Sequence, residues 1–154
     1  MIGRLVSGGQ TGVDRAALDA ALELGVPCGG WCPQGRKAES GIVPDHYPLT
    51  KTPSACYAQR TRWNVRDADA TLILSWGMPT GGTWLTVNEC VKAGKPHLVI
   101  DLAGATDPAG TREWIKANVG GGVLNVAGPR ASKNASVYGR ANAFLLAALG
   151  GARG

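Results

Sequence analysis

The sequence contains no long hydrophobic run. No segment approaches the roughly 18 consecutive apolar residues of a membrane-spanning helix. The first residues, 1–6, form one short apolar stretch that leads directly into polar loop residues, unlike the apolar region of a secretory signal peptide. We therefore expect a cytoplasmic protein that does not bind membranes.

Histidine is scarce, and cysteine follows no metal-binding pattern. The two histidines, His46 and His97, lie at no metal-ligand spacing from a cysteine or carboxylate, so we expect no intrinsic metal site. Cytosolic thiols stay reduced, and a chain of 154 residues needs no disulfide staples. We therefore interpret the cysteines as packing residues rather than disulfide partners: Cys28, Cys32, Cys56 and Cys90.

The positive charge is modest and spread along the chain. A formal net charge of +5 suits an anionic ligand but is too diffuse to indicate DNA or RNA binding. The densest basic cluster is Arg60, Arg62 and Arg66, which together with Trp63 could form a nucleic-acid strip. A solvated helix face is the favoured interpretation, and we expect no nucleic-acid partner.

Apolar runs alternate with helical patterns along the whole chain, as in βαβ units around a parallel sheet. This alternation predicts a single ligand-binding domain over residues 1–154, with a Rossmann-like three-layer α/β/α fold. The mainly parallel sheet has about five or more strands, near residues 3–7, 27–31, 70–75, 96–101 and 122–127. Helical patterns lie between them, and the last runs over 135–149. Prolines and glycines break every period over 32–55, which predicts a long functional loop.

A glycine-rich loop, residues 7–12 (Ser-Gly-Gly-Gln-Thr-Gly), follows the first predicted strand and opens a helix. Backbone N–H groups and the positive end of a helix stabilise an anion in such a place. The loop lacks the first glycine of the dinucleotide fingerprint, and no acidic residue follows near Trp31 to bind a ribose. No Lys-Ser or Lys-Thr pair completes a Walker P-loop either. The loop therefore predicts phosphate binding without nicotinamide chemistry.

Two further loops follow predicted strands and precede helical segments, residues 75–83 and 128–134. Singly, each is as consistent with a tight turn as with a ligand site. Together the three loops end parallel strands at the same edge of the sheet, where open α/β folds bind ligands. We therefore expect them to form one site.

Four acids could carry out proton chemistry: Asp14, Glu39, Asp69 and Glu89. Asp14 falls in the first turn of a predicted helix, where a carboxylate is favourable for structural reasons alone. A structural role and a ligand contact are equally consistent with its position.

Residues 7–19, followed by 30–39, strongly resemble the molybdenum cofactor carrier family, and 61–66, 81–83 and 128–130 fit the same pattern. The resemblance covers nearly the whole chain. It implies a Rossmann-like homodimer or homotetramer that stores, protects and delivers the cofactor rather than converting it. The ligand would be Mo-molybdopterin, or an oxyanion such as molybdate or tungstate. Recipients would be molybdoenzymes or cofactor-synthesis proteins.

By this resemblance the glycine-rich loops would hold the pterin phosphate, and basic side chains would add contacts. The implied binding residues are Gly8, Gly9, Gln10, Thr11, Gly12, Arg15, Lys37, Arg62, Ser75, Gly81, Gly82, Thr83, Arg130, Ser132 and Lys133, with Arg36 as a further cation.

The same loops also look like those of the cytokinin-activating phosphoribohydrolases. Their motif, Pro-Gly-Gly-x-Gly-Thr-x-x-Glu, is matched in part by residues 79–83, but Thr86 stands where the glutamate is expected and Glu89 follows one helical turn later. That shift is about 5 Å along a helix. Binding is therefore favoured over catalysis. The alternatives are a nucleoside-monophosphate hydrolase using Glu89 or Asp14, and a nucleotide-sensing module.

Overall fold

Five parallel strands form the central sheet of the structure, a computed structural model that describes residues 2–150. They are β1 (Arg4–Val6), β2 (Cys28–Gly29), β7 (Ala70–Ser75), β8 (His97–Asp101) and β9 (Val123–Ala127). Their order across the sheet is β2-β1-β9-β7-β8, which places the last of these strands in the middle. Leu5 pairs with Leu124, and Leu72 pairs with Val126. All five predicted strands and the parallel sheet are confirmed.

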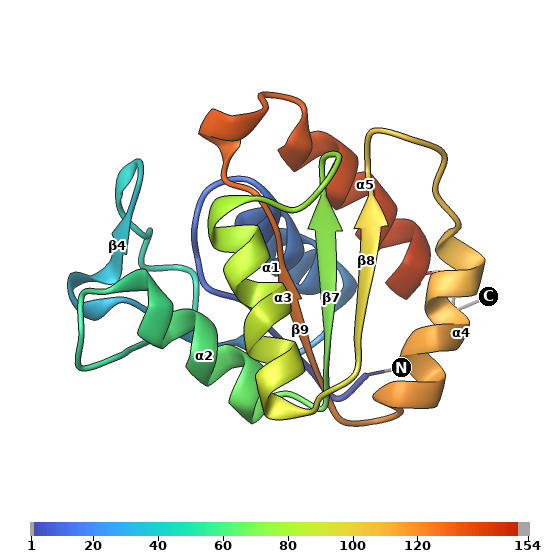
Figure 1. Cartoon of the computed structure of the whole chain (residues 1–154), viewed down its shortest axis with the longest axis horizontal. Coiled ribbons are helices and arrows are strands. Elements are labelled where there is room, and N and C mark those ends of the chain that lie inside the picture. Colours follow the sequence, from blue (N-terminus) through green and yellow to red (C-terminus); the bar gives the residue numbers. More distant parts are fainter. Residues whose placement is uncertain (1, 151–154) are drawn as a thin grey trace.

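Helices cover both faces of this sheet (Figure 1). On one face, α1 (Val13–Leu24) packs against α5 (Val137–Gly150), which also contacts α4 (Pro108–Asn118). On the other face, α2 (Tyr57–Asp67) packs against α3 (Gly81–Ala93). This arrangement confirms the predicted Rossmann-like three-layer fold.

Local sequence signals explain where several elements begin and end. α1 stops at Gly25, whose left-handed φ of 72° lets its N–H bond the carbonyls of Ala21 and Leu22. α4 begins after Asp107, whose carboxylate accepts the Gly110 N–H at 2.9 Å. All six residues of β7 are buried because helices cover both faces of the central strands.

The segment predicted as one long loop, 32–55, contains short regular pieces. β3 (Trp31–Cys32) pairs with β6 (Thr50–Lys51), and β4 (Lys37–Ala38) pairs with β5 (Gly41–Ile42) in a small hairpin. The hairpin lies at the edge of the molecule beside α2 in Figure 1. A prediction from periodicity missed these pairings because each strand has only two residues.

Two sequence interpretations need correction. Cys56 is exposed, so it is not a packing residue, whereas Cys32 and Cys90 are buried and all four thiols are free. Arg60 does not belong to a solvated helix face, since its side chain is only 12% exposed, against 58% for Arg62. Among the described residues, no helix has the length and apolar character needed to cross a bilayer.

Candidate functional site

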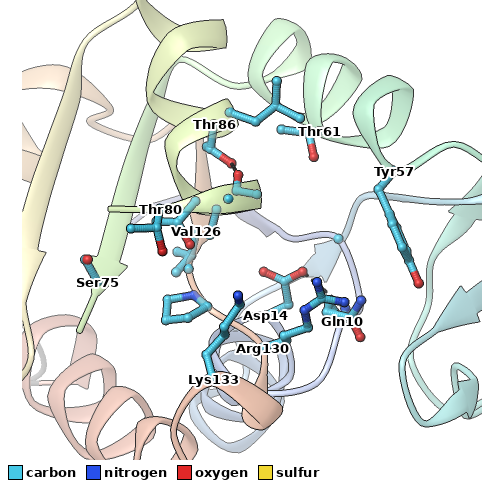
Figure 2. Close-up of a pocket in the computed structure, with 18 of the residues that line it drawn as sticks. Gln10, Asp14, Tyr57, Thr61, Ser75, Thr80, Thr86, Val126, Arg130 and Lys133 are labelled. Atoms are coloured by element: carbon cyan, nitrogen blue, oxygen red, sulfur yellow. Dashed lines mark hydrogen bonds between the residues drawn. The ribbon is translucent and has the colours of Figure 1, made fainter. Parts of the chain in front are cut away.

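A cavity of about 300 Å³ opens at the carboxyl ends of β1, β9 and β7. The winding of the chain reverses here: α1 leads outward from β1 to β2 on one face, while α3 leads from β7 to β8 on the other. Parallel α/β sheets bind ligands at such a switch point. Figure 2 shows side chains from α2 and α3 on one side of the cavity, facing the loop of Arg130 and Lys133 on the other.

The loop after β7 supplies backbone donors. Thr80 is the N-cap of α3, and its carbonyl accepts the N–H groups of Thr83 and Trp84. The N–H groups of Gly81 and Gly82 donate to nothing else in the described chain, and both glycines line the cavity. Unused N–H groups at the positive end of a 13-residue helix favour an anion.

The loop after β9 supplies cations to the same cavity. Arg130 and Lys133 flank the short 3-10 turn η2 (Ala131–Lys133), and both line the cavity. Lys133 is exposed and makes no ion pair with a described residue. Arg130 Nε lies 3.8 Å from Glu39 Oε2 at the rim. With Arg60, three cations surround a space lined by a single carboxylate, Asp14.

The loop after β1 uses much of its hydrogen-bonding capacity internally. The Gln10 N–H donates to Asp14 Oδ2 at 3.1 Å, and the Thr11 N–H donates to Gln10 Oε1 at 3.1 Å. The Val13 N–H, the first of α1, donates to the Pro129 carbonyl at 3.2 Å. The protein's own acceptors therefore occupy positions where the sequence predicted a ligand anion.

Asp14 and Arg60 form a buried ion pair beside this loop. Arg60 donates to Asp14 Oδ2 at 3.2 Å and to the Gly8 carbonyl at 2.9 Å, and the two charged side chains are only 12% and 8% exposed. Burial raises the pKa of Asp14, and the Arg60 charge and the Gln10 N–H offset this only in part. A Cβ on Gly8 would lie 1.9 Å from the Arg60 guanidinium, so this approach requires glycine.

Arg60 is the functional residue that sequence reasoning missed. Its Nε is buried without a hydrogen-bond partner, the one such buried side-chain atom among residues 2–150. Helical spacing places Tyr57, Thr61 and Asn64 on the same side of α2, and all four residues line the cavity. That polar stripe at spacings of three and four was the signal available in the sequence.

Glu39 ties three segments together at the edge of the cavity. Its carboxylate accepts hydrogen bonds from the Thr11 hydroxyl and from Ser132, whose Oγ lies at 2.6 Å. Its backbone N–H donates to Gln10 Oε1 at 2.8 Å. Partial burial opposes ionisation, but the bonds from Ser132 and Thr11 outweigh it and lower the pKa of Glu39. Glu39 therefore fixes the β4–β5 hairpin against the first and last glycine-rich loops.

The structure brings just over half of the implied binding residues to the cavity: Gly8, Gln10, Ser75, Gly81, Gly82, Thr83, Arg130 and Lys133. The others do not line it: Gly9, Thr11, Gly12, Arg15, Lys37, Arg62 and Ser132. Arg15 bonds the Gly9 carbonyl and Ser40, and Lys37 lies over the Tyr57 ring. Arg36 spends its guanidinium on four backbone carbonyls of the 43–49 segment, so its role is structural.

The two alternative catalytic acids separate in the structure. Asp14 lines the cavity, whereas Glu89 does not and instead lies 3.9 Å from Arg62. Asp69 is also remote, since its carboxylate accepts the Val123 N–H at 2.8 Å. Within residues 2–150, no three His, Cys, Asp or Glu side chains gather in a way that could hold a metal ion.

Comparisons with known proteins agree with this geometry. The model of the circularly permuted YpsA SLOG family matches residues 5–149. A crystal structure from Syntrophus aciditrophicus SB, of a protein named putative molybdenum carrier protein, is 42% identical to this chain. The similarity covers 96% of this chain and 95% of that one, with a TM-score of 0.89. A search of curated proteins found no matching relative.

Proposed function

Because the chain belongs to the circularly permuted YpsA SLOG family, we propose that it is a molybdenum cofactor carrier that binds the phosphate of molybdopterin in the cavity above β1, β9 and β7. The 42% identical protein named as a molybdenum carrier supports the ligand class. The chain acts as one ligand-binding domain that stores, protects and delivers its cargo. The observation that carries the proposal is the convergence of cations and unused N–H groups on this one cavity.

The phosphate binds at the N-terminus of α3. Gly81 and Gly82 offer N–H groups there, and Arg130 and Lys133 approach from the loop after β9. Charge-assisted hydrogen bonds of this kind are roughly twice as strong as neutral ones. Molybdate, tungstate or inorganic phosphate would occupy the same position as smaller probes.

The cavity suits a bound cargo better than a hydrolysed one. Glycosidic cleavage by the related hydrolases relies on a glutamate in the helix that follows the glycine-rich motif, and here Thr86 occupies that position. Thr86 donates its hydroxyl to the Gly82 carbonyl at 3.1 Å, which is a structural bond. Asp14 is the one carboxylate among the cavity-lining residues, and its ion pair with Arg60 gives it a structural partner.

The experiment is to incubate the purified protein with molybdenum cofactor and measure the cofactor's half-life and its co-elution on gel filtration. We expect retention and a longer half-life with the wild-type protein, and loss of both with the double variant Arg130→Ala/Lys133→Ala. Lys116→Ala is the matched control, because Lys116 lies on α4 and pairs with Glu113 at 3.5 Å, away from the cavity. A cofactor half-life that the protein leaves unchanged would contradict the carrier proposal.

The same sample tests two further expectations. Gel filtration without cofactor reports whether the carrier is a homodimer or homotetramer. Incubation with nucleoside monophosphates tests the hydrolase alternative, which requires release of free base that Asp14→Asn abolishes.

A further inference from the structure

Two side chains beside the first glycine-rich loop present a hydrogen-bond acceptor and a donor that the protein does not use. Asp14 and Gln10 lie close together in Figure 2, and both line the cavity. They are 5% and 8% exposed. Buried polar atoms are almost always hydrogen-bonded in folded proteins. Open positions on buried groups that face a cavity therefore indicate what a ligand must supply.

Asp14 offers the acceptor. Its Oδ2 receives both the Gln10 N–H and the Arg60 guanidinium, while Oδ1 receives neither. The hydroxyl of Ser7 is close enough to lower the pKa of Asp14, but its hydrogen goes to the Val126 carbonyl at 2.8 Å. Oδ1 thus has lone pairs available for N–H donors of a ligand.

Gln10 offers the donor. Its Oε1 accepts two backbone N–H groups, from Thr11 at 3.1 Å and from Glu39 at 2.8 Å. These two bonds fix which end of the amide is oxygen, because an NH₂ group could not accept them. The Nε2 group has no partner in the described chain and is left as a donor toward the cavity.

We propose that Asp14 and Gln10 bind the lactam edge of a 2-amino-oxo heterocycle, a pterin or a guanine, and so determine the specificity of the site. Asp14 Oδ1 accepts the ring N–H and the neighbouring amino N–H, and Gln10 Nε2 donates to the ring carbonyl. An adenine ring presents only one N–H-bearing group on the equivalent edge, which leaves a lone pair of a buried carboxylate unfilled. The inference rests on the proposed function, since the same ligand places its phosphate at α3.

Ligands that share a sugar phosphate and differ only in the ring edge test this assignment. Isothermal titration compares GMP, IMP and AMP, with neopterin monophosphate carrying the GMP edge on a pteridine and inorganic phosphate as the anion alone. We expect GMP and neopterin monophosphate to bind at least about tenfold more tightly than AMP, with IMP between them because it lacks the amino group.

Asp14→Asn should bring the GMP-to-AMP affinity ratio close to one while inorganic phosphate affinity is retained. Glu23→Gln, an exposed charge removal on the same helix, should leave the ratio unchanged. If Asp14→Asn does not fold, the wild-type ligand series decides alone. Phosphate binding with equal GMP and AMP affinities would overturn the Asp14 assignment only. Failure of every probe, inorganic phosphate included, would overturn the proposed function as well.

Discussion

The loops after β1 and β7 both lead from a parallel strand into a helix, yet they differ in what they leave available. In the first loop, the N–H groups of Gln10, Thr11 and Val13 bond acceptors of the protein. In the second, the N–H groups of Gly81 and Gly82 are unused. The first loop carries its own anion, Asp14, whereas the second faces the cations Arg130 and Lys133 across the cavity.

This difference teaches that a glycine-rich turn at a helix N-terminus is an anion site only if its donors are not already bonded. The sequence of the first loop predicts a phosphate cradle on good physical grounds. The Asp14 carboxylate instead caps that loop from inside the helix that follows it. The first loop is then a rigid wall that presents chosen polar groups, and the second is the place for the phosphate.

The largest expected effect comes from removing the internal anion. Asp14→Ala leaves the Arg60 guanidinium buried without its partner, and we expect the free energy of unfolding to fall by roughly 3–5 kcal/mol. Urea denaturation measures this loss, with Glu23→Ala on the same helix as the control. A loss below about 1 kcal/mol would show that the pair contributes little to the first loop.

Next in size is a contrast between glycines of the two loops. Gly12 has a φ of +81°, and a Cβ there would lie 2.4 Å from the Pro129 carbonyl oxygen, so Gly12→Ala should cost roughly 2–4 kcal/mol of stability. Gly82 has open space around it, and alanine there should change stability by no more than about 1 kcal/mol, in the stabilising direction. Equal losses in urea denaturation would remove the distinction between the loops.

A smaller effect is expected on ligand affinity when one cation is removed beside each loop. Lys133→Ala should weaken inorganic phosphate binding about tenfold, because a charge-assisted contact is lost. Arg15→Ala should leave the affinity nearly unchanged, because Arg15 bonds the Gly9 carbonyl and Ser40 and does not line the cavity. Isothermal titration of both variants checks this, and the reverse ranking would place the phosphate at the first loop.

The smallest effect is a pH dependence of opposite sign for two carboxylates. Asp14 has a raised pKa in the folded protein, so the folded state binds its proton more tightly and stability falls as pH rises from about 4 through that pKa. Glu39 has a lowered pKa, so its contribution is present above about pH 4.3 and is lost as pH falls. Each slope is at most about 1.4 kcal/mol per pH unit.

Urea denaturation of Asp14→Asn and Glu39→Gln against the wild-type protein, between pH 3 and pH 7, measures both contributions. The stability advantage of wild type over Asp14→Asn should shrink as pH rises, and its advantage over Glu39→Gln should grow. Two slopes of the same sign would contradict the assignment of Asp14 as a buried internal anion.

The sequence was sufficient to predict the frame of the site. Apolar runs of five or six residues located β7, β8 and β9, and the loops that follow β1, β7 and β9 do meet at one edge of the sheet. Such features depend on local patterns and on the geometry of parallel sheets, which follow from composition and spacing.

The orientation of individual side chains could not be predicted in the same way. Arg60 approaches Asp14 across 46 positions of sequence, and Glu39 reaches Ser132 across 93. No local pattern encodes such contacts, because they depend on how the β4–β5 hairpin and α2 pack beside the sheet. Arg15 and Lys37 were expected at the ligand for their charge alone, and their direction is set by neighbours that the sequence does not reveal.

The most direct test of the central claim is an NMR titration of backbone amides with inorganic phosphate. The account predicts saturable shifts of the Gly81 and Gly82 amide signals, with little change at Gln10, Thr11 and Val13, whose N–H groups are already bonded. Saturable shifts at Gln10, Thr11 and Val13 with none at Gly81 and Gly82 would contradict it and return the phosphate to the first loop.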